Sequence, residues 1–132
     1  MVDRIRTAIE KNDNFYIMVL IPLLPGFTGE VDQSEATFLK VIMHWQYRAI
    51  FRHRNSLLRR VSLLTDHPEK YIKFYSLRGH GKINGIPKTE MIYIHSKLMI
   101  IDDTTVILGS ANINDRSMNG DRDSEICILV EG

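Results

Sequence analysis

The sequence predicts a mixed α/β fold in which a mixed β-sheet is flanked by helices. Apolar residues within 2–9 and 38–50 recur at the spacing of one helical face. Residues 15–27 form an almost continuous apolar run, which is typical of a buried strand in a parallel sheet. Residues 71–77 alternate between polar and apolar side chains, which predicts a further strand. Helices and strands mixed in this order indicate the α/β class.

The first third of the chain predicts a helix, a strand and a loop. The N-terminal helix ends at "NDN", residues 12–14. The apolar run over 15–27 is the strand, and its prolines, Pro22 and Pro25, stop it. The polar stretch "TGEVDQSEAT" at 28–37 then predicts a loop.

The middle of the chain predicts one long helix from about Glu35 to Leu64. Ser34 is the expected N-cap, because a serine oxygen can accept a hydrogen bond from an amide of the first turn. A break is expected near Asn55-Ser56, and "DHP" at 66–68 ends the helix.

The remaining elements are mostly strands. "RGHGKINGIPKTE" at 78–90 is rich in glycine and lysine, so we expect a loop there. A hairpin turn is expected at 102–105. The predicted strands of this part of the chain are 71–77, 91–101, 105–110 and 124–130.

The length, composition and charge of the chain limit the classes of protein to which it can belong. The chain has 132 residues, 44% hydrophobic and 25% charged, which fits one modest domain or a piece of a larger one. Its net charge of +1 gives no global attraction to nucleic acid, so no nucleic acid partner is expected. The single cysteine, Cys127, excludes an internal disulfide and fits a reducing compartment. No apolar run approaches the roughly 20 residues of a membrane span, and no secretory signal is recognisable, so we expect a cytoplasmic protein.

The stretch "YIHSKLMIIDDTTVILGSANIN" at 93–114 contains the polar residues of greatest chemical interest. If 91–101 is a strand, His95 and Lys97 share one face while the other face is core. Ser110 and Asn112 share a face just beyond Gly109. If the two strands form a hairpin, these four polar side chains converge.

An imidazole, an ammonium, a hydroxyl and an amide make a poor metal site and a good anion site. Lys97 would supply the charge, and Ser110 and Asn112 the hydrogen-bond donors. His95 could attack phosphorus or transfer a proton. Taken singly, His95 could be a structural histidine and Lys97 an edge-protecting lysine. Structural roles explain the whole cluster poorly.

The pattern His95-x-Lys97-x4-Asp102, followed by Gly109-Ser110-x-Asn112, resembles the HKD signature of the phospholipase D superfamily. "IPLLPGF" at 21–27, "IMHWQYR" at 42–48 and the stretch 109–126 are similar to the second HKD half of eukaryotic phosphatidylcholine-hydrolysing phospholipases D. The resemblance implies that residues 1–132 are a single partial domain, one incomplete HKD repeat, with the motif region at 93–125.

The resemblance also implies roles for the motif residues. His95 would be one of two catalytic histidines, one forming a phosphohistidine and the other protonating the leaving alcohol. Lys97, Ser110 and Asn112 would hold the phosphate oxygens. Asp102 completes the catalytic motif, although such an aspartate is more often structural.

Further residues are expected to support the motif. Glu125 would hydrogen-bond the imidazole and fix its tautomer, or else be a surface carboxylate. Gly109 would support the site without contacting the substrate. Asp115-Arg116-Ser117 could form an outer layer, with an Arg116–Asp123 ion pair. The family uses no metal and no cofactor for this reaction, and none is expected here.

The implied reaction is hydrolysis, or alcohol exchange, of phosphatidylcholine at a membrane surface, giving phosphatidic acid and choline. The chain has one HKD motif, so the second histidine must come from an N-terminal half or a second copy. One alternative is a single-motif phosphodiesterase or nuclease active as a homodimer. Another is a catalytically silent fragment that binds acidic lipid.

A run of arginines marks a candidate patch for acidic lipids, including phosphoinositides. The opposing interpretation is a solvated helix face whose arginines pair with local acids. Lipid binding would make the protein peripherally membrane-associated. The arginines are Arg48, Arg52, Arg54, Arg59 and Arg60.

Overall fold

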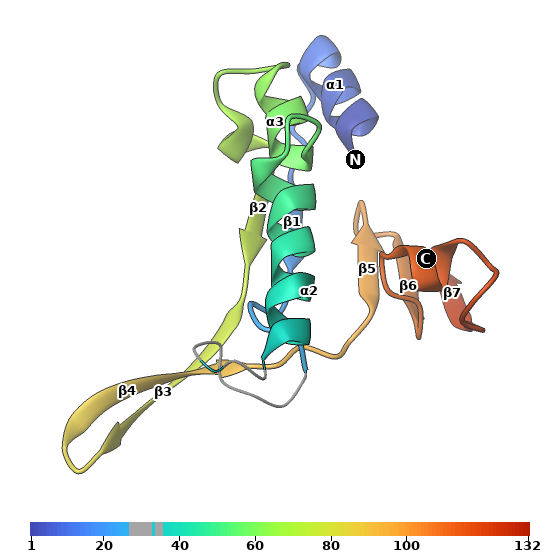
Figure 1. Cartoon of the computed structure of the whole chain (residues 1–132). Coiled ribbons are helices and arrows are strands. Elements are labelled where there is room, and N and C mark those ends of the chain that lie inside the picture. Colours follow the sequence, from blue (N-terminus) through green and yellow to red (C-terminus); the bar gives the residue numbers. More distant parts are fainter. Residues whose placement is uncertain (27–32, 34–35) are drawn as a thin grey trace. The chain divides into compact units, whose positions relative to one another are not determined.

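The computed structural model describes residues 1–26, 33 and 36–132 (Figure 1). The chain divides into two compact units, Met1–Ile94 and His95–Gly132. The predicted mixed α/β class is confirmed, with helices and seven strands among the described residues. These strands form three small sheets, β1-β2, β3-β4 and β5-β6-β7, rather than the one mixed sheet that was expected.

The N-terminal helix of the first unit lies where the sequence places it. Helix α1 spans Val2–Lys11 and ends at Asn12, whose backbone is left-handed with φ 55°. Asparagine adopts this conformation more readily than most residues, because its short polar side chain can bond locally. The "NDN" stop signal is therefore confirmed.

The long helix predicted for 35–64 is interrupted, as expected. Helix α2 spans Thr37–Tyr47 and continues as a π-helical turn, η1, over Arg48–Arg52. The backbone is extended at His53 (φ −79°, ψ 151°). Helix α3 then spans Leu57–Ser62, with Ser56 as its N-cap. The Oγ of Ser56 accepts a hydrogen bond from the Arg59 amide at 3.4 Å. The expected N-cap Ser34 and most of the expected loop 28–37 lie outside the described residues.

Strands β1 (Ile17–Leu20) and β2 (Ile72–Tyr75) pair in parallel, as the apolar run predicted. The expectation that this strand is buried was wrong for one face, because Ile17 and Val19 pack on the core whereas Met18 and Leu20 are exposed. Strand β1 is shorter than the predicted 15–27, because its last pairing with β2 comes just before Pro22, which has no amide to donate. A short 3₁₀ helix, η2 (Pro68–Lys70), leads into β2. The core joins these strands to α1 and α3 through the buried side chains of Val2, Ile5, Val61 and Ile72.

The prediction of a loop at 78–90 was wrong. Strands β3 (Leu77–Ile83) and β4 (Ile86–Ile92) form an antiparallel hairpin. Its turn is Asn84-Gly85, with φ of 51° and 79°. An Asn-Gly pair with both φ positive favours a tight turn whose twist matches the strands. This local signal was present in the sequence and outweighs the glycine and lysine content of the segment.

The second unit is an antiparallel sheet with one short helix. Strand β5 (Leu98–Ile101) pairs with β6 (Thr105–Gly109), and β6 pairs with β7 (Cys127–Glu131). Helix α4 spans Asp115–Met118. The expected hairpin at 102–105 is confirmed, with positive φ at Asp102 and Asp103.

The predicted strand 91–101 is divided. Strand β4 ends at Ile92 and β5 begins at Leu98, so His95 lies in an irregular segment. The inference that His95 and Lys97 share a strand face was therefore wrong. The β5-β6 pairing extends only as far as the bond from the Gly109 amide to the Lys97 carbonyl. Within the described parts of the chain, no helix combines the length and the apolar character of a membrane span.

Candidate active site

The chemistry-bearing residues of the second unit gather at one end of its sheet. The Gly109 amide donates to the Lys97 carbonyl at 3.1 Å, so the residues before β5 and those after β6 meet there. His95 is exposed and Lys97 is half-buried. The Lys97 Nζ donates to the His95 carbonyl at 2.6 Å, which holds the ammonium beside the histidine backbone.

Gly109 is a glycine because β7 comes very close. A Cβ at this position would lie 2.5 Å from the Ile126 carbonyl oxygen and 2.7 Å from the Cys127 Cβ. Separations this short are repulsive, so any side chain would push β6 and β7 apart. The absence of a side chain lets the next residue, Ser110, bond directly to the opposing strand.

Ser110 is fixed from three directions. Its amide donates to the Ile126 carbonyl at 3.0 Å, and its Oγ accepts from the Ile126 amide at 3.0 Å. The same Oγ donates to the Glu125 Oε2 at 2.5 Å. The serine therefore presents its hydroxyl in one orientation, with Glu125 as the acceptor.

Glu125 is held in its ionised form. The hydrogen bond from Ser110 is the largest cause that lowers the pKa of Glu125 below its usual range, followed by a bond from Ser117. The positive charge of Lys97 also lowers this pKa, whereas the nearby Asp123 raises it. Lys97, Ser110 and Glu125 thus form one electrostatically linked group.

The loop after Ser110 is organised by Ser117. The Asn112 amide donates to the Ser117 Oγ at 3.1 Å, and the Ser117 amide donates to the Asn114 Oδ1 at 3.0 Å. Asn114 is thereby the N-cap of α4. The sequence analysis did not identify this cap, although asparagine is a preferred N-cap residue and the acidic Asp115 follows it in the first turn. Ser117 links the Asn112 backbone to Glu125.

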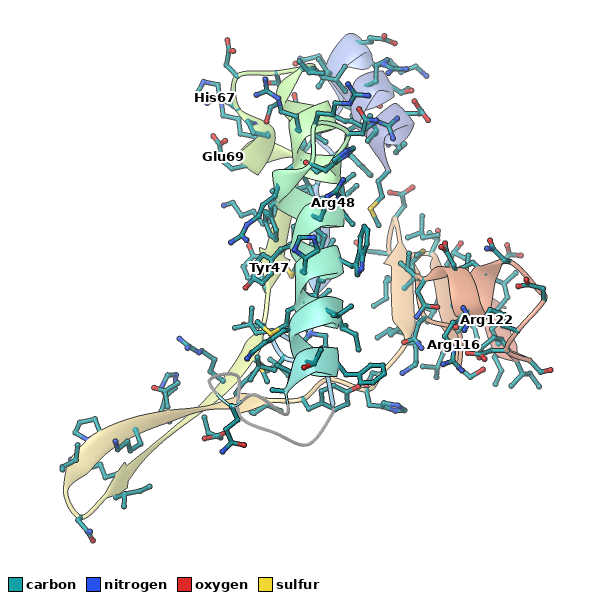
Figure 2. The ribbon with its side chains drawn as sticks, viewed as in Figure 1. Tyr47, Arg48, His67, Glu69, Arg116 and Arg122 are labelled. Atoms are coloured by element: carbon teal, nitrogen blue, oxygen red, sulfur yellow. The ribbon has the colours of Figure 1, made fainter. Side chains whose placement is uncertain are left out.

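The expected Arg116–Asp123 ion pair is confirmed. The Arg116 Nε and Nη2 donate to the two carboxylate oxygens of Asp123 at 3.1 and 2.9 Å. This fork lowers the pKa of Asp123 and raises that of Arg116. The Asp123 amide also donates to the Arg116 carbonyl at 3.2 Å, so the pair closes the loop 116–123, which ends two residues before Glu125. Figure 2 labels Arg116 and Arg122 in this unit.

The family model described as Phospholipase D matches residues 1–130. The chain belongs to the phospholipase D family. It is 53% identical over 132 residues to "Phospholipase D" of Phytophthora infestans, covering 99% of the chain and 7% of the relative. It is 48% identical to "Phospholipase D zeta 1" of Arabidopsis thaliana (97% and 12%) and 46% identical to "Phospholipase D1" of Homo sapiens (99% and 12%). The chain therefore spans a small part of the length of these curated relatives.

Within this phospholipase D chain, Asp102 lies apart from the other motif residues. It occupies the β5-β6 turn with φ 50°, at the opposite end of β5 from Lys97. The four residues of β5 lie between the two, so about 16 Å of extended chain separates them. This placement does not support a catalytic role for Asp102. It supports a role in forming the turn.

The five candidate lipid-binding arginines of the phospholipase D chain are exposed, but they are spread over different elements. Arg48 and Arg52 lie in η1, where their guanidinium groups stack over Trp45 and Tyr47 at 5.4 and 5.1 Å from the ring centroids. Figure 2 labels Tyr47 and Arg48 at the end of α2. Within residues 1–26, 33 and 36–132, no ion pair involves these arginines. The remaining three are Arg54, Arg59 and Arg60.

Proposed function

We propose that this chain supplies one of the two HKD motifs of a phospholipase D, which cleaves a phospholipid phosphodiester at a membrane surface. The observation that carries the proposal is the linked group of Lys97, Ser110 and Glu125 beside His95. The Lys97 ammonium has N–H donors beyond the one bonded to the His95 carbonyl, and such a cation at the sheet end suits a phosphate group. Family membership supports the same reaction class.

In the proposed reaction, one imidazole nitrogen attacks phosphorus and the P–O bond to the headgroup breaks. The second histidine protonates the departing alcohol oxygen. Water, or another alcohol, then loses a proton to that histidine and attacks phosphorus, and the P–N bond breaks. With phosphatidylcholine and water the products are choline and phosphatidic acid.

The proposed role of Lys97 and Asn112 is to stabilise the negative charge that grows on the phosphate oxygens in the transition state. Ser110 would assist from its bond to Glu125, because a hydroxyl whose proton points at a carboxylate keeps a fixed geometry. Glu125 and Ser117 would act through Ser110 and Asn112 rather than on the substrate. Asp102 is proposed to shape the β5-β6 turn.

The test is choline release from phosphatidylcholine vesicles. The chain is assayed alone and together with a second polypeptide that carries the proposed N-terminal HKD motif, with molar mass measured in parallel. We expect release only from the combined halves, and its loss in His95→Asn. The matched control His67→Asn, which changes an exposed histidine paired with Glu69, should keep full release.

Two results would contradict the proposal. Release from the chain alone at twice its monomer mass would favour a homodimeric single-motif phosphodiesterase. Absence of release from correctly assembled halves, with retained vesicle binding, would favour a silent lipid-binding fragment.

A further inference from the structure

The β3-β4 hairpin has an exposed apolar tip. Ile83 and Ile86 face each other across the Asn84-Gly85 turn, and their exposed fractions are 62% and 59%. Most of the surface of these two aliphatic residues is in contact with water, which is unfavourable. This arrangement points to a partner that covers the tip.

Basic side chains lie just behind this tip. Arg78, His80 and Lys82 alternate along β3, so they share one face with about 7 Å between neighbours. Lys88 adds a further cation from β4. Arg78, Lys82 and Lys88 against the single acid Glu90 leave two net positive charges on the hairpin, with His80 counted as neutral.

The base of the hairpin is attached to the segment after β1. The Leu24 amide donates to the Met91 Sδ at 3.2 Å, and the Tyr93 ring fills the space beside Gly26, where a Cβ would lie 2.8 Å from the ring. Strands β3 and β4 form a two-stranded sheet of their own (Figure 1). The base is therefore held, while residues 80–90 are all exposed.

We propose that the β3-β4 hairpin docks on anionic bilayers, with Ile83 and Ile86 among the upper acyl chains and Lys82 and Lys88 at the lipid phosphates. This inference rests on the proposed function: the hairpin is the element that would bring the chain to its phospholipid substrate. Apolar side chains gain by leaving water, and lysines near an anionic surface are attracted to it. The chain's overall net charge of +1 makes this local charge the relevant one.

The hairpin backbone limits how deeply the tip can enter. Outward-facing amides and carbonyls of a two-stranded ribbon have no partner in hydrocarbon, so only the turn can leave water without a large cost. Pro87, directly beyond Ile86, has no amide proton and removes one such donor near the tip. The geometry thus favours shallow insertion.

Vesicle co-sedimentation of the 132-residue chain measures membrane binding without any turnover. The docking proposal is therefore tested independently of the catalytic role. We use phosphatidylcholine vesicles with and without phosphatidylserine. Ile83→Ser/Ile86→Ser is expected to weaken binding to the anionic vesicles roughly tenfold or more. The control Leu63→Ser, which changes an aliphatic side chain with 72% exposure elsewhere, should bind like the parent chain.

The charge component is tested by Lys82→Gln/Lys88→Gln against the control Lys11→Gln/Lys70→Gln. The first pair should lose most of the preference for anionic vesicles, and the second should keep it. Equal binding by the tip variant and the parent chain, or equal loss in both lysine pairs, would overturn the proposal.

A fluorescent probe reports the location of the tip directly. The polarity-sensitive dye NBD is attached at Ile86→Cys in a Cys127→Ser background, with Lys11→Cys as the control site. We expect a blue shift at position 86 with anionic vesicles and none at position 11. An unshifted emission at position 86 from vesicle-bound protein would show that another surface does the binding.

Discussion

At the scale of single residues, Ser110 lowers the pKa of Glu125. Its hydroxyl is the largest cause of the lowered pKa of Glu125. We predict that Ser110→Ala raises this pKa toward that of an ordinary glutamate, because the ionised carboxylate loses its main donor. Carboxyl chemical shifts followed by NMR during a pH titration measure the change. Ser62→Ala, which removes a hydroxyl bonded to the Leu58 carbonyl, is the control and should leave the titration unmoved.

The same pKa shift fixes the sign of a pH effect. The pKa of Glu125 is lowered in the folded state, so its contacts stabilise the fold above the unfolded value, about 4.3. That contribution is lost as the pH falls through the folded-state pKa. Ser110→Ala should therefore make unfolding of the second unit less sensitive to pH below about 4.3. An unchanged pH dependence would mean that the Ser110 bond is absent in solution.

Gly109 is a second residue whose identity is dictated by its surroundings. In Gly109→Ala the new methyl group would meet the Ile126 carbonyl and Cys127, so we predict a loss of about 1–3 kcal/mol in unfolding free energy. Thermal or urea unfolding measures it. Gly81→Ala is the control, since a Cβ there would have no heavy atom within 4 Å. Equal stability of the two variants would contradict the close β6-β7 approach.

At the scale of elements, the β3-β4 hairpin depends on its turn. Gly85 has φ 79°, and a Cβ added there would have no heavy atom within 4 Å beyond its chain neighbours, so the effect of a substitution is conformational. We predict that Gly85→Val costs the hairpin about 1–2 kcal/mol, because a β-branched residue is poorly tolerated at positive φ. Amide hydrogen exchange in β3 and β4 should accelerate. Gly81→Val, within β3, should not have this effect, and equal acceleration in both would count against a tight turn.

Elements with regular patterns could be predicted from the sequence, and those decided by tertiary contacts could not. Helix α1, the break before α3 and the parallel β1-β2 pair follow from apolar spacing and capping residues. The residues around His95 read as strand because they alternate, yet pairing with β6 stops at Gly109. Alternation predicts the faces of a strand only where a partner strand exists.

The candidate site shows the same limit. Residue types and spacing predicted that Lys97 and Ser110 come together, and the hairpin geometry brings their backbones to one sheet end. The links of Ser117 to Asn112 and to Glu125 depend on how the loop 111–124 folds back. A loop of that length has no period from which its side-chain contacts could be inferred.

At the scale of the whole molecule, the β5-β6-β7 sheet is apolar on both faces. Leu98, Leu108 and Ile128 lie opposite one another on one face, with exposed fractions of 56%, 51% and 63%. Met99 and Leu129, on the other face, are 40% and 58% exposed. A sheet with two apolar faces is typical of one covered on both sides.

We therefore predict that the isolated chain self-associates as its concentration rises. Leu108→Lys/Ile128→Lys should shift sedimentation velocity profiles toward the monomer, because charge on the sheet face opposes contact between copies. Leu63→Lys, which changes an exposed aliphatic side chain of the first unit, is the control and should not shift the profiles. Profiles that are monomeric for the parent chain at all concentrations would refute the prediction.

The turn at Asp102–Thr104 has a consequence for insertions and deletions. Its length sets which residue of β6 stands opposite each residue of β5, and Gly109 meets Lys97 only in this register. Removing one turn residue would shift β6 by one position and send the Ser110 side chain to the opposite side of the sheet. The spacing between the motif residues is thus as constrained as the residues themselves. A gene copy that keeps His95, Lys97 and Ser110 but loses one codon between Asp102 and Thr104 would encode every reactive group and still separate them.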